Sequence, residues 1–259
     1  QIAYESEKFM LPIRLGMANA KEAQELMVFT LTKNGRVEST NYKTVKIPTG
    51  QEVPLYIRGE FAKFYPAVFS TAHAKENYRA VHTEYVWNTG WCDPCADNPL
   101  TPEELRGLGV FWLAEAPQYP QPYPRPIPGG GAAAQPIAPM MPPPPPYRGL
   151  GRPMPYGGQQ PILTRLHIRY DAEHFPEDLL FQETGDQQNF QARYVLRHPA
   201  VGDLSCPAGQ QYQQALHQRQ LAEVDKLSEL TGWKKEEIAA KAGVDAKQSG
   251  GSWYENLWK

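Results

Sequence analysis

The residues of this chain best suited to chemistry are its three cysteines, two of which form a Cys-x-x-Cys pair, Cys92 and Cys95. The third, Cys206, has no histidine or cysteine close to it in sequence. Such a pair indicates disulfides in an oxidising compartment, and thiol redox chemistry or half of a zinc site in the cytosol. Because three cysteines cannot all pair within one chain, at least one must be free, bind metal or join another polypeptide. We expect structural disulfides, either Cys92–Cys95 with Cys206 left for another chain, or Cys95–Cys206.

A second candidate is the acidic stretch that contains Asp171, Glu173 and His174. Two carboxylates and an imidazole could hold a divalent cation. Asp and His side chains placed before Pro176 are also typical of a turn that leads into a helix. We favour the turn and predict no cofactor, with a divalent metal at these three residues as the alternative.

No motif in the sequence identifies a reaction. The Gly-x-Ser-x-Gly, Gly-x-Gly-x-x-Gly and Walker patterns are absent, so nothing supports a serine hydrolase or a nucleotide site. The formal charge is −2 with acidic and basic residues interleaved, which argues against a nucleic-acid partner. No apolar run is long enough to cross a membrane.

Residues 117–161 differ in composition from the rest of the chain, being rich in Pro, Gly, Ala, Gln and Tyr. Proline fixes φ and lacks a backbone donor, so this segment favours extended conformations and cannot enter the interior of a sheet. It is either a disordered insertion or an adhesive arm that docks onto a neighbour through its tyrosines, Tyr119, Tyr123, Tyr147 and Tyr156.

Strand patterns lie on both sides of this arm. Leu26–Thr32 and Arg36–Ile47 flank Asn34-Gly35, which predicts a β-hairpin with a tight turn. Arg79–Asn88 alternates, with Val81, Thr83, Tyr85 and Trp87 on one face and His82 and Glu84 on the other. After the arm, Leu166, Ile168 and Tyr170 share one face of a strand, and Arg165, His167 and Arg169 share the opposite face. The arm therefore interrupts one sheet.

Helix signals complete the pattern. Gly59–Lys75 predicts a helix that Pro66 bends or splits, and Thr101, Pro102 and Glu104 form a capping-box signature. Two C-terminal helices are expected, one over roughly Gly209–Leu230 that ends at Gly232 and one over Lys234–Ala242 that ends at Gly243.

These elements predict an α+β fold: an antiparallel or mixed sheet with a C-terminal helical hairpin and a long Pro-rich insertion. Residues 1–116 and 162–204 would form one β-rich domain, residues 117–161 the extended insertion, and residues 205–259 the C-terminal helices with an aromatic tail. The tail side chains Trp253, Tyr254 and Trp258, like the arm residues Tyr119, Tyr123 and Tyr147, are predicted to bind a partner.

Four strings of the sequence are long enough to be specific: Phe9-Met10-Leu11-Pro12-Ile13-Arg14-Leu15, Gly90-Trp91-Cys92-Asp93-Pro94-Cys95, Arg169-Tyr170-Asp171-Ala172-Glu173-His174 and Tyr194-Val195-Leu196-Arg197-His198-Pro199. They resemble a bacterial family of exported proteins, the domain-of-unknown-function family numbered 2330. The resemblance implies an exported protein with oxidised cysteines and a further cysteine-containing N-terminal region, so this chain would be the C-terminal part of a longer precursor. A first residue of Gln1 instead of Met fits that expectation.

The sequence thus favours a non-catalytic, extracytoplasmic structural or binding subunit of a bacterial surface or envelope assembly. Its expected partner is the N-terminal remainder of the same precursor or another subunit. Two alternatives stay open: a thiol-redox or metal-dependent enzyme that uses Cys92 and Cys95, and a carbohydrate- or cell-wall-binding module.

Overall fold

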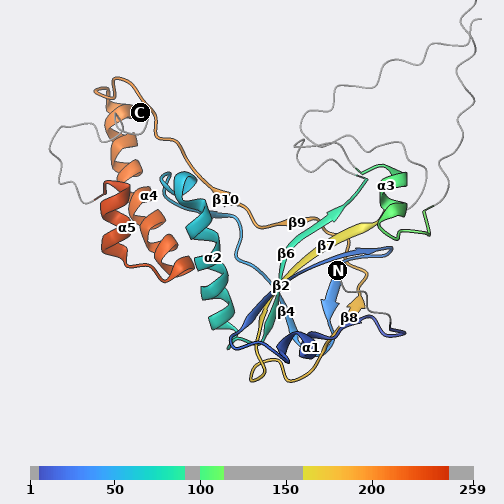
Figure 1. Ribbon diagram of the computed structural model, residues 1–259. Coiled ribbons are helices and arrows are strands. Elements are labelled where there is room, and N and C mark those ends of the chain that lie inside the picture. The colour runs from blue at the N-terminus through green and yellow to red at the C-terminus, as the bar shows by residue number, and fades with distance from the viewer. Residues whose placement is uncertain (1–5, 91–99, 114–159, 245–259) are drawn as a thin grey trace, which may run out of the picture.

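A mixed sheet with helices on one face and small strands on the other organises the chain (Figure 1). The computed structural model describes residues 6–90, 100–113 and 160–244. The α+β class predicted from the sequence is confirmed, as are the C-terminal helices. In chain order the elements are β1 (Met10–Leu11), α1 (Ile13–Met17), β2 (Gln24–Thr32), β3 (Val37–Ser39), β4 (Lys43–Lys46), β5 (Gln51–Glu52), α2 (Ile57–Lys75), β6 (Ala80–Asn88), α3 (Pro102–Gly107), β7 (Ile162–Tyr170), β8 (Leu179–Glu183), β9 (Phe190–Gln191), β10 (Tyr194–Val195), α4 (Pro207–Thr231) and α5 (Lys235–Ala242).

The main sheet of the described residues has the strand order β2-β7-β6-β4, with β9 added beside β6. Strand β7 is central and runs antiparallel to both β2 and β6, whereas β4 runs parallel to β6. Strands β6 and β7 are neighbours although residues 117–161 separate them in sequence. Such pairing is what an insertion into one sheet requires.

One face of the sheet forms an apolar core with the small strands. The predicted alternation of β7 is confirmed, because Leu166, Ile168 and Tyr170 are all buried on this side. Phe175 and Leu179 from the segment around β8 pack against them. Strand β8 itself lies between β1 and β3 in a separate antiparallel sheet.

The opposite face is covered by α2, and α4 and α5 pack against α2 (Figure 1). Phe64, Leu227 and Ile238 are fully buried in this second core. Pro66 lies inside α2, but the non-helical backbone that interrupts the helix is at Glu60. The break in the helix that was expected at Pro66 therefore lies earlier in the chain, at Glu60.

The predicted helix ends are confirmed. Thr101 and Glu104 form a reciprocal capping box at the start of α3. Gly232 and Gly243 adopt positive φ at the ends of α4 and α5, a conformation that glycine reaches without steric cost.

The predicted β-hairpin around Asn34-Gly35 is wrong. Strand β2 pairs with β7 and β3 pairs with β8, so the two strands next to this glycine belong to different sheets. Gly35 does not have a positive φ. A Cβ atom at this position would collide with the carbonyl oxygen of Thr184 and the backbone of Asp186. A glycine is therefore needed here because the segments around residues 35 and 185 approach each other closely.

Two further stretches with strand-like apolar patterns, Phe9–Ala18 and Phe190–His198, contain short strands. The stretch Phe9–Ala18 contains the two-residue strand β1 and then the helix α1, so it is not one extended segment. Phe190–His198 divides into β9, which pairs with β6, and β10, which pairs with β5.

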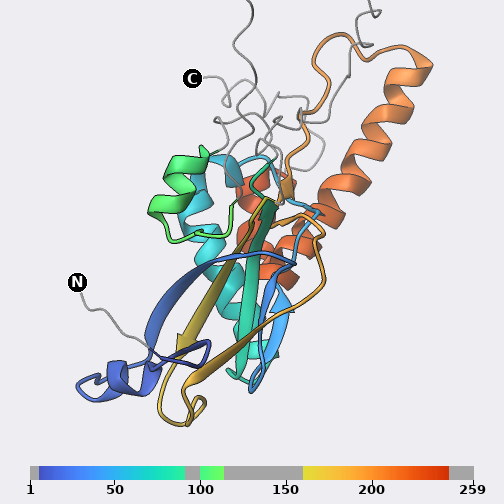
Figure 2. The same ribbon diagram turned by 90° about the vertical axis from the view of Figure 1, so that its right-hand side faces the viewer.

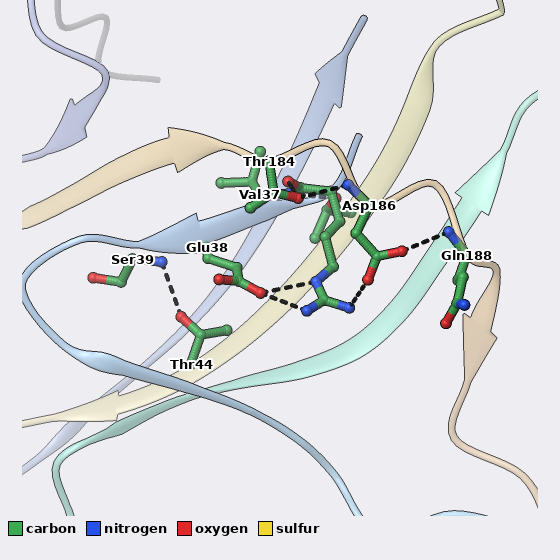
Figure 3. Close-up of polar contacts among 9 residues, drawn as sticks. Val37, Glu38, Ser39, Thr44, Thr184, Asp186 and Gln188 are labelled. Atoms are coloured by element: carbon green, nitrogen blue, oxygen red, sulfur yellow. Dashed lines mark hydrogen bonds and ion pairs between the residues drawn. The ribbon is translucent and has the colours of Figure 1, made fainter. Parts of the chain in front are cut away.

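Arg36 joins the two segments that meet at Gly35, and Figure 3 labels three of its partners, Glu38, Thr184 and Asp186. Its backbone N–H donates to the carbonyl of Asp186 (2.8 Å), and its carbonyl accepts from the N–H of Thr184 (2.9 Å). Its guanidinium bonds to Glu38 (2.9 Å from Nε) and also to the Asp186 carboxylate. The Asp186 carboxylate in turn accepts from the N–H of Gln188 (2.8 Å). These bonds fix the register of β3 against the end of β8.

This arrangement predicts that Gly35→Ala destabilises the protein by about 1–3 kcal/mol, because the added methyl group displaces packed backbone. Gly185→Ala is the matched control, since a Cβ at Gly185, in the same turn, meets no atom within 4 Å. Urea unfolding followed by tryptophan fluorescence measures both. Equal free energies of unfolding for the two variants would contradict the close approach at Gly35.

Candidate functional site

A row of charged and polar side chains on β7 faces α2. Because successive residues of a strand point to opposite faces, Arg165, His167 and Arg169 project away from the apolar row that contains Leu166. His167 is nearly buried, with 6% of its side chain exposed, whereas Arg165 and Arg169 are partly exposed at 38% and 32%. The row therefore connects the interior of the sheet with its surface.

Glu84 of β6 is the buried anchor of this row, with 2% of its side chain exposed. Its Oε1 lies 2.8 Å from Nδ1 of His167, and its Oε2 lies 2.9 Å from Nε of Arg165. The pairing of β6 with β7 skips Glu84, passing from Thr83–Leu166 to Tyr85–Arg165. Glu84 is thus the extra residue of a β-bulge, a device that redirects a side chain.

The electrostatics of Glu84 follow from its partners. Burial raises the pKa of Glu84, but hydrogen bonds from His167 and Tyr65 and the charge of Arg165 more than offset this, so the pKa lies below its ordinary value. Burial and the nearby Glu84 charge raise the pKa of Tyr65. Glu84 is therefore ionised and Tyr65 stays protonated as a donor, an arrangement that holds structure in place.

The phenyl ring of Phe69 in α2 packs against three histidines. The ring of His167 stacks on it at 3.5 Å between centroids, and His82 and His73 lie at 5.2 and 5.6 Å. Arg169 completes the cluster from 5.2 Å above the same ring. No group of three or more His, Cys, Asp or Glu side chains within residues 6–90, 100–113 and 160–244 has an arrangement that could hold a metal ion.

His73 and His82 are buried without charge. Burial, and after it the neighbouring positive groups, lowers the pKa of each to about 4. Neither ring nitrogen of His82 has a hydrogen-bond partner in the part of the chain that the structure describes. Both imidazoles are thus neutral at pH 7 and serve as packing groups between α2 and the sheet.

The outer end of the polar row reaches strand β2, which forms one edge of the sheet (Figure 2). Arg169 binds Glu25 with 2.8 Å between Nε and Oε1. Arg165 lies 5.7 Å from the centre of the Phe29 ring and 3.8 Å from the sulfur of Met27. The exposed fractions of Phe29 and Met27 are 62% and 39%. An apolar strip on an edge strand is a surface suited to binding another polypeptide.

The predicted metal site at Asp171, Glu173 and His174 is a turn. One carboxylate oxygen of Asp171 accepts from the backbone N–H groups of Glu173 (3.0 Å) and His174 (2.8 Å). The same carboxylate lies 2.8 Å from Nδ1 of His174. Its acceptors are therefore used for local capping of the turn that the sequence favoured, but the helix expected after this turn is wrong, because the next element is the strand β8.

Cys206 is exposed and caps the N-terminus of α4, where its Sγ accepts from the N–H of Gly209 at 3.3 Å. It makes no disulfide with any residue that the structure describes. The other predicted functional residues lie outside the described residues, and their assignments stay predictions: Cys92, Cys95, Tyr119, Tyr123, Tyr147, Trp253, Tyr254 and Trp258.

A cavity of about 230 Å³ lies between α4, α5 and the segment before α2. Its charged groups are already paired, since Arg219 lies 3.3 Å from Glu223 and Arg197 lies 2.6 Å from Glu52. Burial raises the pKa of Glu223. We therefore regard the edge of β2 as the better candidate for a binding site.

The sequence analysis identified neither the apolar strip on β2 nor the bulge that redirects Glu84. The signal for the β2 strip was present, because Met27 and Phe29 alternate with Leu26 and Val28 and make both rows of one strand apolar. Two apolar rows predict contacts on both faces. Glu84 was placed on the correct face, but nothing in the local pattern indicated the bulge. After the bulge, Tyr85 pairs with Arg165 and therefore lies on the face opposite to the one predicted.

Comparison with known proteins gives one match. A family model described as an uncharacterized protein conserved in bacteria (DUF2330) covers residues 1–182. That range includes β2, α2, β6 and β7, hence every residue of the polar row and of the apolar strip, and ends before α4. No curated protein and no solved structure matches the chain.

The buried histidines predict acid sensitivity. Their pKa is about 4 in the folded protein and near 6.5 when unfolded, so the unfolded chain binds protons more readily. Their contribution is complete above about pH 6.5 and is lost as the pH falls toward 4. Between about pH 7.5 and pH 5 the free energy of unfolding should fall by about 2 kcal/mol for each histidine.

Urea unfolding at the two pH values measures this loss. His82→Leu should reduce the pH dependence, although His73, His167, Glu76 and Glu84 still act on the site. His217→Leu is the control, because His217 is exposed on α4. If His82→Leu and the unchanged protein lose equal stability on acidification, His82 is not buried as a neutral group.

Proposed function

The chain belongs to the DUF2330 family of uncharacterized bacterial proteins, and we propose that it is a non-catalytic binding subunit of an extracytoplasmic bacterial assembly. Its partner is the N-terminal remainder of the same precursor or another subunit, and it binds that partner through the edge of β2.

The observation that carries this proposal is the composition of β2. Edge strands of soluble proteins are usually short, covered or charged, because an open edge pairs with other chains. Strand β2 has nine residues, Glu25 is its one charged side chain, and Met27 and Phe29 are exposed. A partner that adds a strand here would bond to the backbone and cover both side chains, a common mode of protein recognition.

The strip is held in place before a partner arrives. Arg165, which covers part of Phe29, is itself paired with the buried Glu84. Arg169 is bound to Glu25 at one end and to Ser70 of α2 at the other, with 3.1 Å between Nη1 and Oγ. Because these side chains are already ordered, binding costs less conformational entropy.

A second group of exposed apolar side chains supports a binding role. Leu108, Phe111 and Trp112, which follow α3, are 63%, 83% and 42% exposed. Exposed large apolar groups that gather in one short segment mark interaction surfaces more often than isolated ones do.

The proposed extracytoplasmic location rests on the family resemblance and on the cysteines. Cys206 is exposed and can reach a thiol of another polypeptide. No helix within the described residues is long and apolar enough to cross a membrane. We place the protein in the periplasm, on the cell surface or outside the cell.

A photo-crosslinking experiment tests the proposal. The photoreactive residue p-benzoylphenylalanine replaces Phe29 in the native host, the cells are irradiated, and covalent adducts are identified by mass spectrometry. Since Phe29 should be covered by a partner, we expect a discrete adduct recovered from the envelope or the secreted fraction.

The matched control carries the same photoreactive residue at Phe61, an exposed aromatic on α2 with 49% exposure. Position 61 should give at most weak adducts. The proposal fails if position 29 gives no more adduct than position 61, or if the protein is recovered from the cytoplasm alone.

A further inference from the structure

We propose that the partner that adds to β2 is a second copy of this chain, with the two β2 strands antiparallel about a twofold axis through Phe29. This inference rests on the proposed function, because it names the occupant of the same edge.

The outer edge of β2 is open to a further strand. Strand β2 is in register with β7 over all of Gln24–Thr32, so its inner side is fully paired. Its outer side has no strand partner among residues 6–90, 100–113 and 160–244. A nine-residue strand is about 30 Å long, so a second strand of the same length would meet an uninterrupted row of backbone donors and acceptors.

The side chains of two β2 strands match when the pair is centred on Phe29. In an antiparallel pair centred on Phe29, that residue meets Phe29 of the second copy. Met27 meets the second copy's Leu31, and Glu25 meets the second copy's Lys33. A twofold axis repeats each of the last two contacts. The exposed apolar strip is thus covered by apolar groups, and opposite charges meet at both of its ends.

Registers centred one residue away lack this match. A centre at Val28 would place Glu25 opposite Leu31, and a centre at Thr30 would place Met27 opposite Lys33. Each of these sets a charge against an apolar side chain. A shift of one residue in register changes every cross-strand pair, so the side chains select the centre at Phe29.

Arg165, the arginine next to the axis, is compatible with this pairing. Arg165 lies over Phe29 and would approach the interface in both copies. Its guanidinium is paired with Glu84 (2.9 Å), so pairing the strands brings no unpaired positive charge to the axis. The guanidinium instead adds a cation–π contact at the edge of the aromatic pair.

The mass in solution tests the proposal. Light scattering coupled to gel filtration, run over a range of concentrations, should give twice the 29.2 kDa mass of one chain. Phe29→Lys should raise the dissociation constant at least about tenfold, because it puts like charges at the centre of the interface. Phe61→Lys, the control at an exposed aromatic of α2, should leave it unchanged. A chain that is monomeric throughout, or a Phe29→Lys variant that dimerises normally, overturns the inference.

Phe29→Ser repeats the test if Phe29→Lys lowers the urea midpoint, since serine removes the ring and adds no charge. Loss of the dimer in a folded Phe29→Ser variant supports the proposal, and a dimer as tight as that of the unchanged chain overturns it.

A charge exchange tests the register. Lys33→Glu alone should weaken the dimer, since it faces the second copy's Glu25, and adding Glu25→Lys should restore part of the affinity. Because Glu25 also binds Arg169 in its own chain, urea unfolding checks the fold of both variants. A dimer that responds to Phe29→Lys but not to the charge changes overturns the centre at Phe29.

The two proposals can fail separately. If the chain is monomeric and the photoreactive group at position 29 couples to a different protein, the second copy is the wrong partner and the binding function stands. If position 29 gives no adduct and the chain is monomeric, both proposals fail.

Discussion

The buried carboxylate of Glu84 constrains more of this structure than any other group. An ionised carboxylate away from water costs several kcal/mol unless donors surround it. Its partners come from two elements, Tyr65 from α2 and both Arg165 and His167 from β7. The bulge in β6, the polar row on β7 and the position of α2 must therefore form together. Through Arg165 the same constraint extends to Phe29 at the open edge of the sheet.

Local signals in the sequence predicted local structure well. The capping box at Thr101, the glycine caps at Gly232 and Gly243 and the alternation of β7 depend on residues within one or two turns of each other. Their chemistry is complete within the segment, because a cap needs only the orphan backbone groups of its own helix. The α+β class followed from the sum of these elements.

Strand partners and the site could not be predicted in this way. Asn34-Gly35 has the composition of a hairpin turn, but the atoms that require a glycine come from Thr184 and Asp186, far along the chain. Glu84 is displaced by a bulge that exists only because β7 lies beside it. Whether β2 lies at the edge of the sheet depends on whether a distant segment pairs with its outer side. Each of these facts is a property of distant segments in contact, which single-strand patterns do not contain.

The place of β7 in the chain has a consequence for biosynthesis. Among the described strands, β2 and β6 do not pair with each other, and each pairs with β7, which is made after both of them and after the arm. A nascent chain therefore has no central sheet until residues 162–170 have been made, and the contacts of the fold are mostly of the long-range kind that slows folding. During that interval the apolar strands are open to aggregation and to chaperones. Any pathway that must transport the polypeptide while it is still unfolded would benefit from this delay.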